Sequence, residues 1–190
     1  MDEFLCKKVL QALKFASSAH EGQRRKDEHQ TPYISHPAGV GLVLSKAGYS
    51  EDVIVAGVLH DIVEDTKYGH DEIQKMFGTK VATIVAEVTE DKSLPYNEQK
   101  DEYINHLETA SVEALAVSGA DLLANRVDML INFEQGDDLW LKPPHTTELP
   151  RKLERDRKRI EIIKRRANPP FIEELESVTN EVHRYLIRHT

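Results

Sequence analysis

The pattern of apolar and polar positions along the chain is helical almost throughout. Over residues 3–19 the apolar side chains recur at the three- to four-residue spacing of a helix and form one face. A second helix is predicted from Pro37 to near Gly48, since proline can open a helix and glycine can end one. Further helices are predicted over residues 51–64, 71–77, 79–88, 97–109 and 111–134, followed by two between 147 and 188. We therefore expect an all-α protein.

We expect this helical protein to form one domain over residues 1–190. Its core would cover about residues 3–134, with a C-terminal helical appendage over about residues 147–188. Two stretches are predicted to be exposed loops, the polar residues 21–35 and residues 135–150, which are rich in Gly, Asp and Pro. We expect Trp140, in the second loop, to cap the core.

The segment AGVLHDIVEDT places polar chemistry in a helix that otherwise reads as buried. Neighbouring residues on a helix project about 100° apart, so His60 and Asp61 can both reach one ion at a pocket wall. Glu64 and Asp65 follow one turn later and would lie above this pair, where carboxylates suit water activation. On its own the pair fits a core histidine followed by a solvated acidic turn better than a metal site, because isolated motif matches are often false.

A ligand set of imidazole and carboxylate groups suits a divalent ion such as Mn, Fe or Zn better than a set of thiolates would. Cys6 is the one cysteine of the chain, which excludes an internal disulfide, and we expect it to pack in the core. Manganese is the favoured ion. An ion of this kind lowers the pKa of a water molecule and neutralises phosphoryl oxygens, while Glu64 orients or deprotonates the water. That chemistry is phosphoester or pyrophosphate hydrolysis.

Four segments carry a resemblance to a known family: AHEGQRRKDEHQTPYISHPAGV, AGVLHDIVEDT, MFGTKVATIVAEVTEDKSLP and GADLLANRVDM. Together they resemble the HD-domain hydrolases of the RelA/SpoT group, and more closely the small alarmone hydrolases called metazoan SpoT homologues. The resemblance covers residues 15 to 130. It implies an HD-domain helical bundle with a metal site in a central cleft, and removal of the 3′-pyrophosphate from guanosine tetra- or pentaphosphate with one Mn²⁺ ion.

The resemblance also implies roles for individual residues. The metal ligands would be His36, His60, Asp61 and Asp121. Glu64 and Asp65 would be the catalytic pair, and the substrate would contact Arg25, Lys26 and Asn125. No second histidine pair follows, so a single ion is expected.

The chain departs from the family pattern beside Asp121. Leu122 stands where the family has a basic residue, and Ala124 stands where it has an aromatic residue or histidine. A missing cation and a missing ring would weaken phosphate pairing and nucleotide packing, and would leave a roomier, more apolar wall with a looser base preference. Adenosine alarmones, the 2′-phosphate of NADPH and a nucleotide-binding module without turnover therefore remain open.

Charge and length add further expectations. The formal net charge is −8, which argues against a nucleic-acid partner. No stretch approaches the length of a membrane-spanning helix and no signal peptide opens the chain, so we expect a cytoplasmic enzyme, with no indication of its oligomeric state. The 190 residues leave no room for the synthetase domain of bifunctional relatives.

Several residues are given structural roles. The basic run over residues 150–166 is expected to be a solvated, salt-bridged face, with a cleft rim as the alternative. Gly119 would allow close backbone approach near the metal. Trp140 would stack on a base as the alternative to capping the core. We expect His20 to be structural. Six other histidines are assigned to the surface: His29, His70, His106, His145, His183 and His189.

Overall fold

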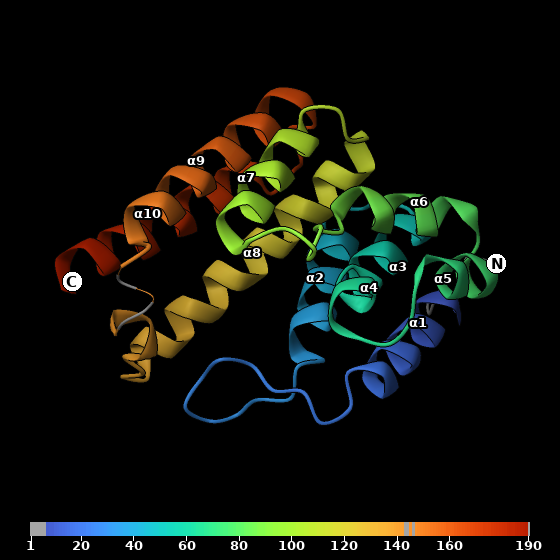
Figure 1. Ribbon diagram of the computed structural model, residues 1–190, viewed down its shortest axis with the longest axis horizontal. Helices are drawn as coiled ribbons and strands as arrows, with labels where there is room; N and C mark the ends of the chain where they lie inside the picture. Colours follow the sequence, from blue (N-terminus) through green and yellow to red (C-terminus); the bar gives the residue numbers. More distant parts are fainter. Residues whose placement is uncertain (1–6, 143–144, 146, 190) are drawn as a thin grey trace.

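The computed structural model describes residues 7–142, 145 and 147–189, and within them it contains helices and no strand (Figure 1). The prediction of an all-α fold is confirmed. The elements are α1 (Lys7–Ala19), α2 (Ser35–Lys46), α3 (Glu51–Leu59), α4 (Ile62–Asp65), α5 (His70–Phe77), α6 (Thr79–Val88), α7 (Tyr96–Leu107), α8 (Val112–Glu134), the 3₁₀ turn η1 (Leu139–Leu141), α9 (Leu149–Arg166) and α10 (Ile172–His189). Cys6 lies outside the described residues.

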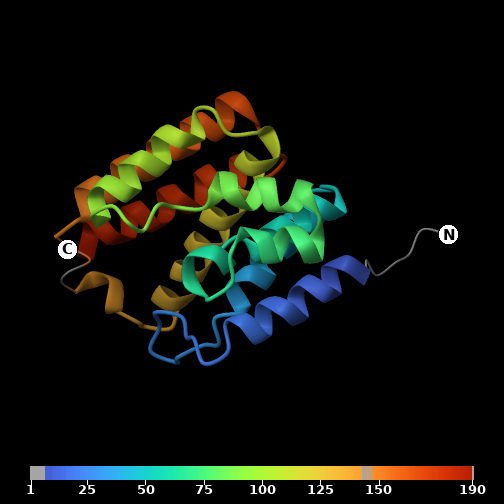
Figure 2. The same ribbon diagram turned by 45° about the vertical axis from the view of Figure 1, so that its right-hand side comes forward.

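Helix α8 runs through the middle of the molecule and separates two groups of helices (Figures 1 and 2). It packs against α2, α3 and α6 on one side and against α9 and α10 on the other. Its start is well defined, because the Ser111 hydroxyl accepts a hydrogen bond from the backbone N–H of Ala114 at 3.1 Å. Residues along α8 can therefore face either group of helices. The expectation of one domain over residues 1–190 stays a prediction.

Gly119 lies within α8 without interrupting it. A Cβ atom at this position would lie 3.2 Å from the ring of Phe171 and 3.5 Å from Ile163. The expectation that Gly119 allows close approach near the metal is therefore wrong. Its small size serves the packing of α8 against α9 and the start of α10.

Glycines also set the close packing of α2 on α3. A Cβ on Gly57 would lie 2.3 Å from Leu44 Cδ1, and a Cβ on Gly41 would lie 2.7 Å from Val58 Cγ2. Neither contact is sterically allowed, so both positions need glycine in this arrangement. The close packing brings the beginning of α2, which carries His36, to the end of α3, which precedes His60.

The helix predicted over residues 51–64 is broken in the structure. Helix α3 ends at Leu59 and α4 begins at Ile62, with a turn at His60 and Asp61. Asp61 has φ −89° and ψ −4°, in the bridge region outside the regular α-helical range. The backbone N–H of Asp65 still donates to the carbonyl oxygen of Asp61 at 2.9 Å, so the i,i+4 relation expected between these two residues is kept across the turn.

Helices α9 and α10 form an antiparallel pair beside α7 and α8 (Figures 1 and 2). The predicted apolar face of α10 is present, with Leu175 and Val182 buried, and Phe171 is buried just before the helix begins. The assignment of His183 to the surface is wrong, because its side chain is only 4% exposed. Its Nε2 lies 2.8 Å from Asp156 Oδ2, and this buried carboxylate is the partner that allows the ring to be buried. In the described part of the chain, no helix is long and apolar enough to cross a bilayer.

Candidate active site and metal centre

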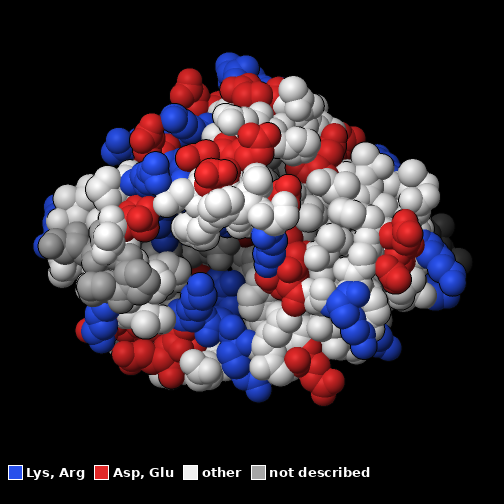
Figure 3. Space-filling model, viewed as in Figure 1, with Lys and Arg blue, Asp and Glu red and all other residues white. Residues whose placement is uncertain are grey.

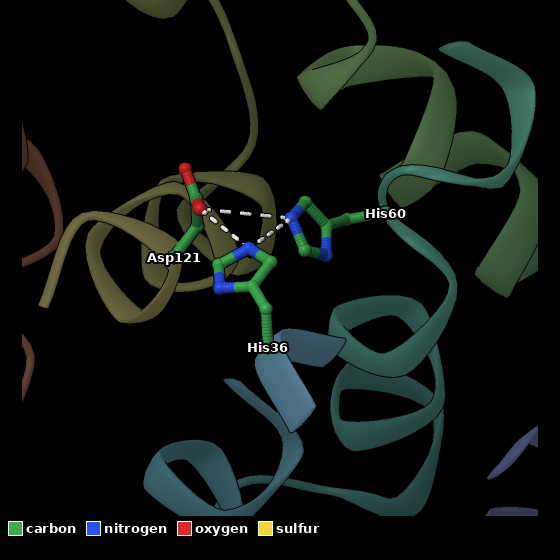
Figure 4. Close-up of side chains that lie close together, drawn as sticks. All are labelled: His36, His60 and Asp121. Carbon is green, nitrogen blue, oxygen red and sulfur yellow. Dashed lines mark hydrogen bonds and ion pairs between the residues drawn. The ribbon is translucent and has the colours of Figure 1, made fainter. Parts of the chain in front are cut away.

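Three side chains from three helices converge on one point (Figure 4). His36 comes from the first turn of α2, His60 from the end of α3 and Asp121 from α8. His36 Nε2 lies 3.1 Å from Asp121 Oδ1 and 3.3 Å from His60 Nε2. His60 Nε2 lies 3.6 Å from Asp121 Oδ1. Ligands about 2.1 Å from one ion are separated by about 3.0–3.4 Å, so the three atoms fit a shared divalent cation.

Asp61, the fourth predicted ligand, lies beside these atoms. Its Oδ1 is 3.1 Å from His60 Nε2, and its Oδ2 is 3.6 Å from His36 Nε2. His60 and Asp61 are neighbours at the turn between α3 and α4, and both side chains face His36. The structure thus brings together all four residues that the sequence predicted as ligands.

A backbone contact selects the tautomer of the His60 ring. His60 Nδ1 lies 2.8 Å from the carbonyl oxygen of Gly57, which can only accept a hydrogen bond. In the neutral ring Nδ1 therefore carries the proton, and the Nε2 atom that faces His36 and Asp121 is the one able to bind an ion. Hydrogen bonding of the far ring nitrogen in this way is typical of metal-binding histidines.

Arg159 of α9 holds the second oxygen of Asp121. Its Nη2 donates to Asp121 Oδ2 at 2.7 Å, and its Nε donates to the Ser118 hydroxyl at 2.9 Å. Burial favours the neutral carboxyl, but the Arg159 guanidinium and the two histidines outweigh it and hold the pKa of Asp121 well below its ordinary value. Asp121 is consequently a carboxylate with one oxygen anchored and the other aimed at His36.

Glu64 faces the same cavity from α4. Its Oε1 accepts a hydrogen bond from the backbone N–H of Glu90 at 2.8 Å. Burial raises its pKa to about 7, and the charges of Glu90 and Asp61 add to the rise although the Glu90 N–H opposes it. A carboxylate that titrates near neutrality suits general acid–base chemistry, because it can take and return a proton at working pH.

Asp65 is held between Lys92 and Tyr33. It forms an ion pair with Lys92, and the Tyr33 hydroxyl lies 3.4 Å from its Oδ2. The same hydroxyl donates to Asp61 Oδ2 at 2.6 Å, and burial together with the Asp61 charge raises the pKa of Tyr33. Tyr33 therefore stays protonated and couples Asp61 to Asp65. The buried His20 ring lies 4.8 Å from the Tyr33 ring, which agrees with a structural role.

Arg25 and Asn125 are also brought to the site. Arg25 Nη2 donates to Asn125 Oδ1 at 2.8 Å and to Asp128 Oδ2 at 2.9 Å. Asn125 Nδ2 in turn donates to Asp121 Oδ1 at 2.7 Å. Asn125 thus links Arg25 to a candidate ligand. Lys26 is exposed and borders the cavity.

These residues line a cavity of about 570 Å³, which is large enough for a nucleotide. Figure 3 shows this face hollowed near its middle, with Lys and Arg side chains gathered beside the hollow. The cavity wall includes Arg24, Arg25, Lys26, Lys92, Lys100, Arg126, Lys152 and Arg159. The site is therefore locally cationic although the whole chain is acidic, and it suits an anionic ligand.

The expectation that Leu122 and Ala124 form an apolar wall of the cavity is wrong. Leu122 is buried in the core, and the Cβ atom of Ala124 lies 3.9 Å from the Cβ position of Gly39, on the side of α2. Neither residue lines the cavity, because the turn of α8 that directs Asp121 into it directs these two positions elsewhere. The looser base preference inferred from them loses its structural basis.

The basic run of residues 150–166 has two different faces. Its outer face is solvated as expected, with Lys158 paired to Glu154 at 2.9 Å. The predicted solvated character is wrong for its inner face, where Lys152, Arg155 and Arg159 line cavities. Sequence reasoning missed Arg159, and also Tyr33 and Lys92; the density of basic residues signalled only that this helix could border the cleft.

Comparison with known proteins agrees with this geometry. The model of a family described as "HD domain" matches residues 12–127. Guanosine-3′,5′-bis(diphosphate) 3′-pyrophosphohydrolase MESH1 of Xenopus tropicalis is 46% identical over 123 residues, covering 64% of this chain and 69% of the relative. The Homo sapiens protein of the same name is 42% identical over 123 residues, with the same coverage of 64% and 69%.

A solved structure extends the similarity to the C-terminal helices. It is described as a metazoan ortholog of SpoT that hydrolyzes ppGpp and plays a role in starvation responses. It superposes with a TM-score of 0.80 at 30% identity and covers 96% of this chain and 97% of its own. The predicted resemblance is confirmed, and the chain belongs to the HD-domain family, in its branch of MESH1-like proteins.

Proposed function

We propose that this protein is a metal-dependent hydrolase that removes the 3′-pyrophosphate from alarmones of the (p)ppGpp type. The observation that carries the proposal is the convergence of His36, His60, Asp61 and Asp121 beside Glu64 in a cationic cavity. The names of the relatives support the substrate class.

The proposed cofactor is one Mn²⁺ ion held by the two histidines and two aspartates. The donor set supports a borderline divalent ion, since it combines imidazole nitrogen with carboxylate oxygen. When bound, such an ion lowers the pKa of a water molecule and neutralises charge on phosphoryl oxygens. Arg159 and the Gly57 carbonyl would hold Asp121 and His60 in the orientation that binding requires.

Glu64 is proposed as the general base. Its Oε1 is engaged by the Glu90 N–H, so Oε2 is the atom left to accept a proton from the attacking water. Its pKa of about 7 would leave a substantial fraction ionised at neutral pH. Asp65, restrained by Lys92 and Tyr33, is proposed to orient the water and the leaving group.

Arg25 and Lys26 are proposed to bind the nucleotide and its phosphates at the cavity edge. Arg25 is positioned by Asn125 and Asp128, so its guanidinium is already ordered before a ligand arrives. Lys26 adds a solvent-accessible positive charge. The cytoplasmic location and the absence of a nucleic-acid partner stay predictions.

The test is product analysis with Mn²⁺-loaded protein and a substrate panel. The panel contains ppGpp, its adenosine counterpart and NADPH, and His60→Ala serves as the control without a complete ligand set. We expect GDP and pyrophosphate from ppGpp and no reaction with His60→Ala. Efficient dephosphorylation of NADPH without alarmone turnover would contradict the proposal, and binding of alarmones without any product would indicate a nucleotide-binding module.

A further inference from the structure

A second cavity, of about 480 Å³, adjoins the cleft. It lies between α7 and α9 and is closed at one side by Trp140 of η1. The two cavities share part of their wall, including Arg159, Arg126 and Lys152. None of the four candidate metal ligands lines this second cavity, which is therefore an extension of the first cavity away from the candidate metal centre.

Positive charge dominates the wall of this second cavity. Its basic residues are Lys26, Lys100, Arg126, Lys152, Arg155 and Arg159, and its acidic residues are Glu90, Glu148 and Asp156. Four of the six cations are already paired, in the ion pairs Lys100–Glu90, Arg126–Asp156, Arg155–Asp101 and Arg159–Asp121. Within the described residues, Lys26 and Lys152 have no ion pair.

Lys152 differs from Lys26 in being partly buried. Its Nζ lies 4.2 Å from the centre of the Trp140 ring, a contact that attracts a cation but does not neutralise it. Burial and then the charge of Arg126 lower the pKa of Lys152 to about 7, and Asp156 only partly opposes them. Asp156 and Glu148 border the same cavity, but neither forms an ion pair with Lys152, and an anion in the cavity would be able to do so.

Two protein side chains lie against the Trp140 ring, which also borders both cavities. Besides Lys152, the His145 ring lies against it with a centroid distance of 4.4 Å. A base stacked on the indole would compete with these groups for the area of the ring. The cavity consequently favours a phosphate group over a nucleobase, and Trp140 acts as the support that holds Lys152 toward the cavity.

We propose that the second cavity binds the 5′-phosphates of the nucleotide whose 3′ group is hydrolysed, with Lys152 as their principal ligand. The inference rests on the proposed function and adds a subsite to it. A nucleotide phosphorylated at both ends needs a second cationic site away from the metal centre, and Arg159 lies at the boundary between the two sites. Lys152 would then determine the preference for substrates that carry 5′-phosphates.

The test compares two substrates that differ only at the 5′ end: guanosine 3′-diphosphate with and without a 5′-diphosphate. Loss of one charge-assisted hydrogen bond corresponds to about 20-fold in affinity. We expect Lys152→Met to raise KM about 20-fold for the 5′-phosphorylated substrate and to leave KM for the other within about twofold. Lys152→Arg should restore most of the affinity. The matched control is Lys158→Met, on the exposed face of the same helix.

Proton uptake on ligand binding separates direct phosphate binding by Lys152 from a purely structural role, because a structural role would not change the number of protons taken up. Near pH 8 Lys152 is mostly neutral, so binding of the 5′-phosphates should make it take up a proton. The other charged or titratable groups around it are Lys26, Arg126, His145, Glu148 and Asp156. Calorimetry in buffers of different ionisation enthalpy should detect the uptake.

The calorimetry is done in a Glu64→Gln background, which prevents turnover and removes another group whose pKa is about 7. Uptake that disappears in the added Lys152→Met variant supports the inference. Equal KM changes for both substrates, or uptake that persists without Lys152, would overturn it. Absence of hydrolysis in the wild type would instead refute the proposed function. Calorimetric titration with GDP, which carries phosphates only at its 5′ end, would still decide whether Lys152 binds 5′-phosphates.

Discussion

Arg159 is predicted to be essential for metal affinity although it contacts no candidate metal position itself. Replacing it with methionine keeps the length of the side chain and removes the guanidinium that donates to Asp121 Oδ2 at 2.7 Å and to Ser118. Asp121 would then keep its Oδ1 contacts with Asn125 and His36, but its Oδ2 atom would lose the Arg159 hydrogen bond that orients the carboxylate. Loss of a hydrogen-bond partner that orients a metal ligand costs about 10- to 100-fold in metal affinity.

Stability should change in a way that depends on the ion. Removal of one partner from a buried ion pair costs about 3–5 kcal/mol, because the remaining charge is left uncompensated. Asp121 keeps His36 and His60 as neighbours, so we expect the lower end of that range for the metal-free protein. Added Mn²⁺ should recover part of the loss, since a cation would replace the missing positive charge beside Asp121.

The assay is a Mn²⁺ titration followed by calorimetry, together with thermal unfolding in the presence and absence of the ion. Arg165→Met is the matched control, because Arg165 lies on the same helix in an exposed pair with Glu108. Metal affinity of Arg159→Met within about twofold of that of Arg165→Met would refute the proposed role of Arg159 in orienting Asp121.

Three further predictions concern other parts of the site and fold. Glu64→Gln should keep the ion and lose about 100- to 10,000-fold in kcat, and the wild-type rate should rise as pH passes about 7, because the base must be deprotonated. Neutralising Arg25 and Lys26 should raise KM more than it lowers kcat, with metal content unchanged, as steady-state kinetics and metal analysis would show. Gly57→Ala should lower the free energy of unfolding by about 1–3 kcal/mol in urea titrations, while Gly39→Ala, whose Cβ has ordinary contacts, should not.

Each of these three predictions has its own refuting result. An unchanged rate for Glu64→Gln would move the base role to Asp65. A fall in kcat without a change in KM for the Arg25 and Lys26 double variant would place these residues in the chemical step. Equal stability of Gly57→Ala and Gly39→Ala would show that α2 and α3 can separate without cost.

The helices were predictable because apolar side chains follow a helical period wherever a helix packs on the core. Helix α6 has the predicted bounds, Thr79–Val88. The break at His60 and Asp61 was not predictable, because neither residue is a helix breaker and the turn depends on contacts such as that of Asp61 with Tyr33. Local propensity carries no information about such a contact.

The site was predictable where its residues occur in short motifs and unpredictable where they come from distant helices. His60, Asp61 and Glu64 lie within five positions of sequence, so local spacing indicated shared chemistry. Arg159 reaches Asp121 across 38 positions, and charged residues occupy both faces of α9, so the pattern did not tell which face was buried. The same reason explains the buried His183, whose partner Asp156 lies 27 positions away.

The central claim is that His36, His60, Asp61 and Asp121 form one metal site that supports hydrolysis at the 3′ end of a nucleotide. The most direct test measures bound Mn²⁺ and ppGpp turnover in parallel for the wild type and for Asp61→Ala. We predict about one ion per chain and release of pyrophosphate for the wild type, and loss of both for the variant, because a ligand is removed. Full turnover with the ion retained in Asp61→Ala would contradict the account.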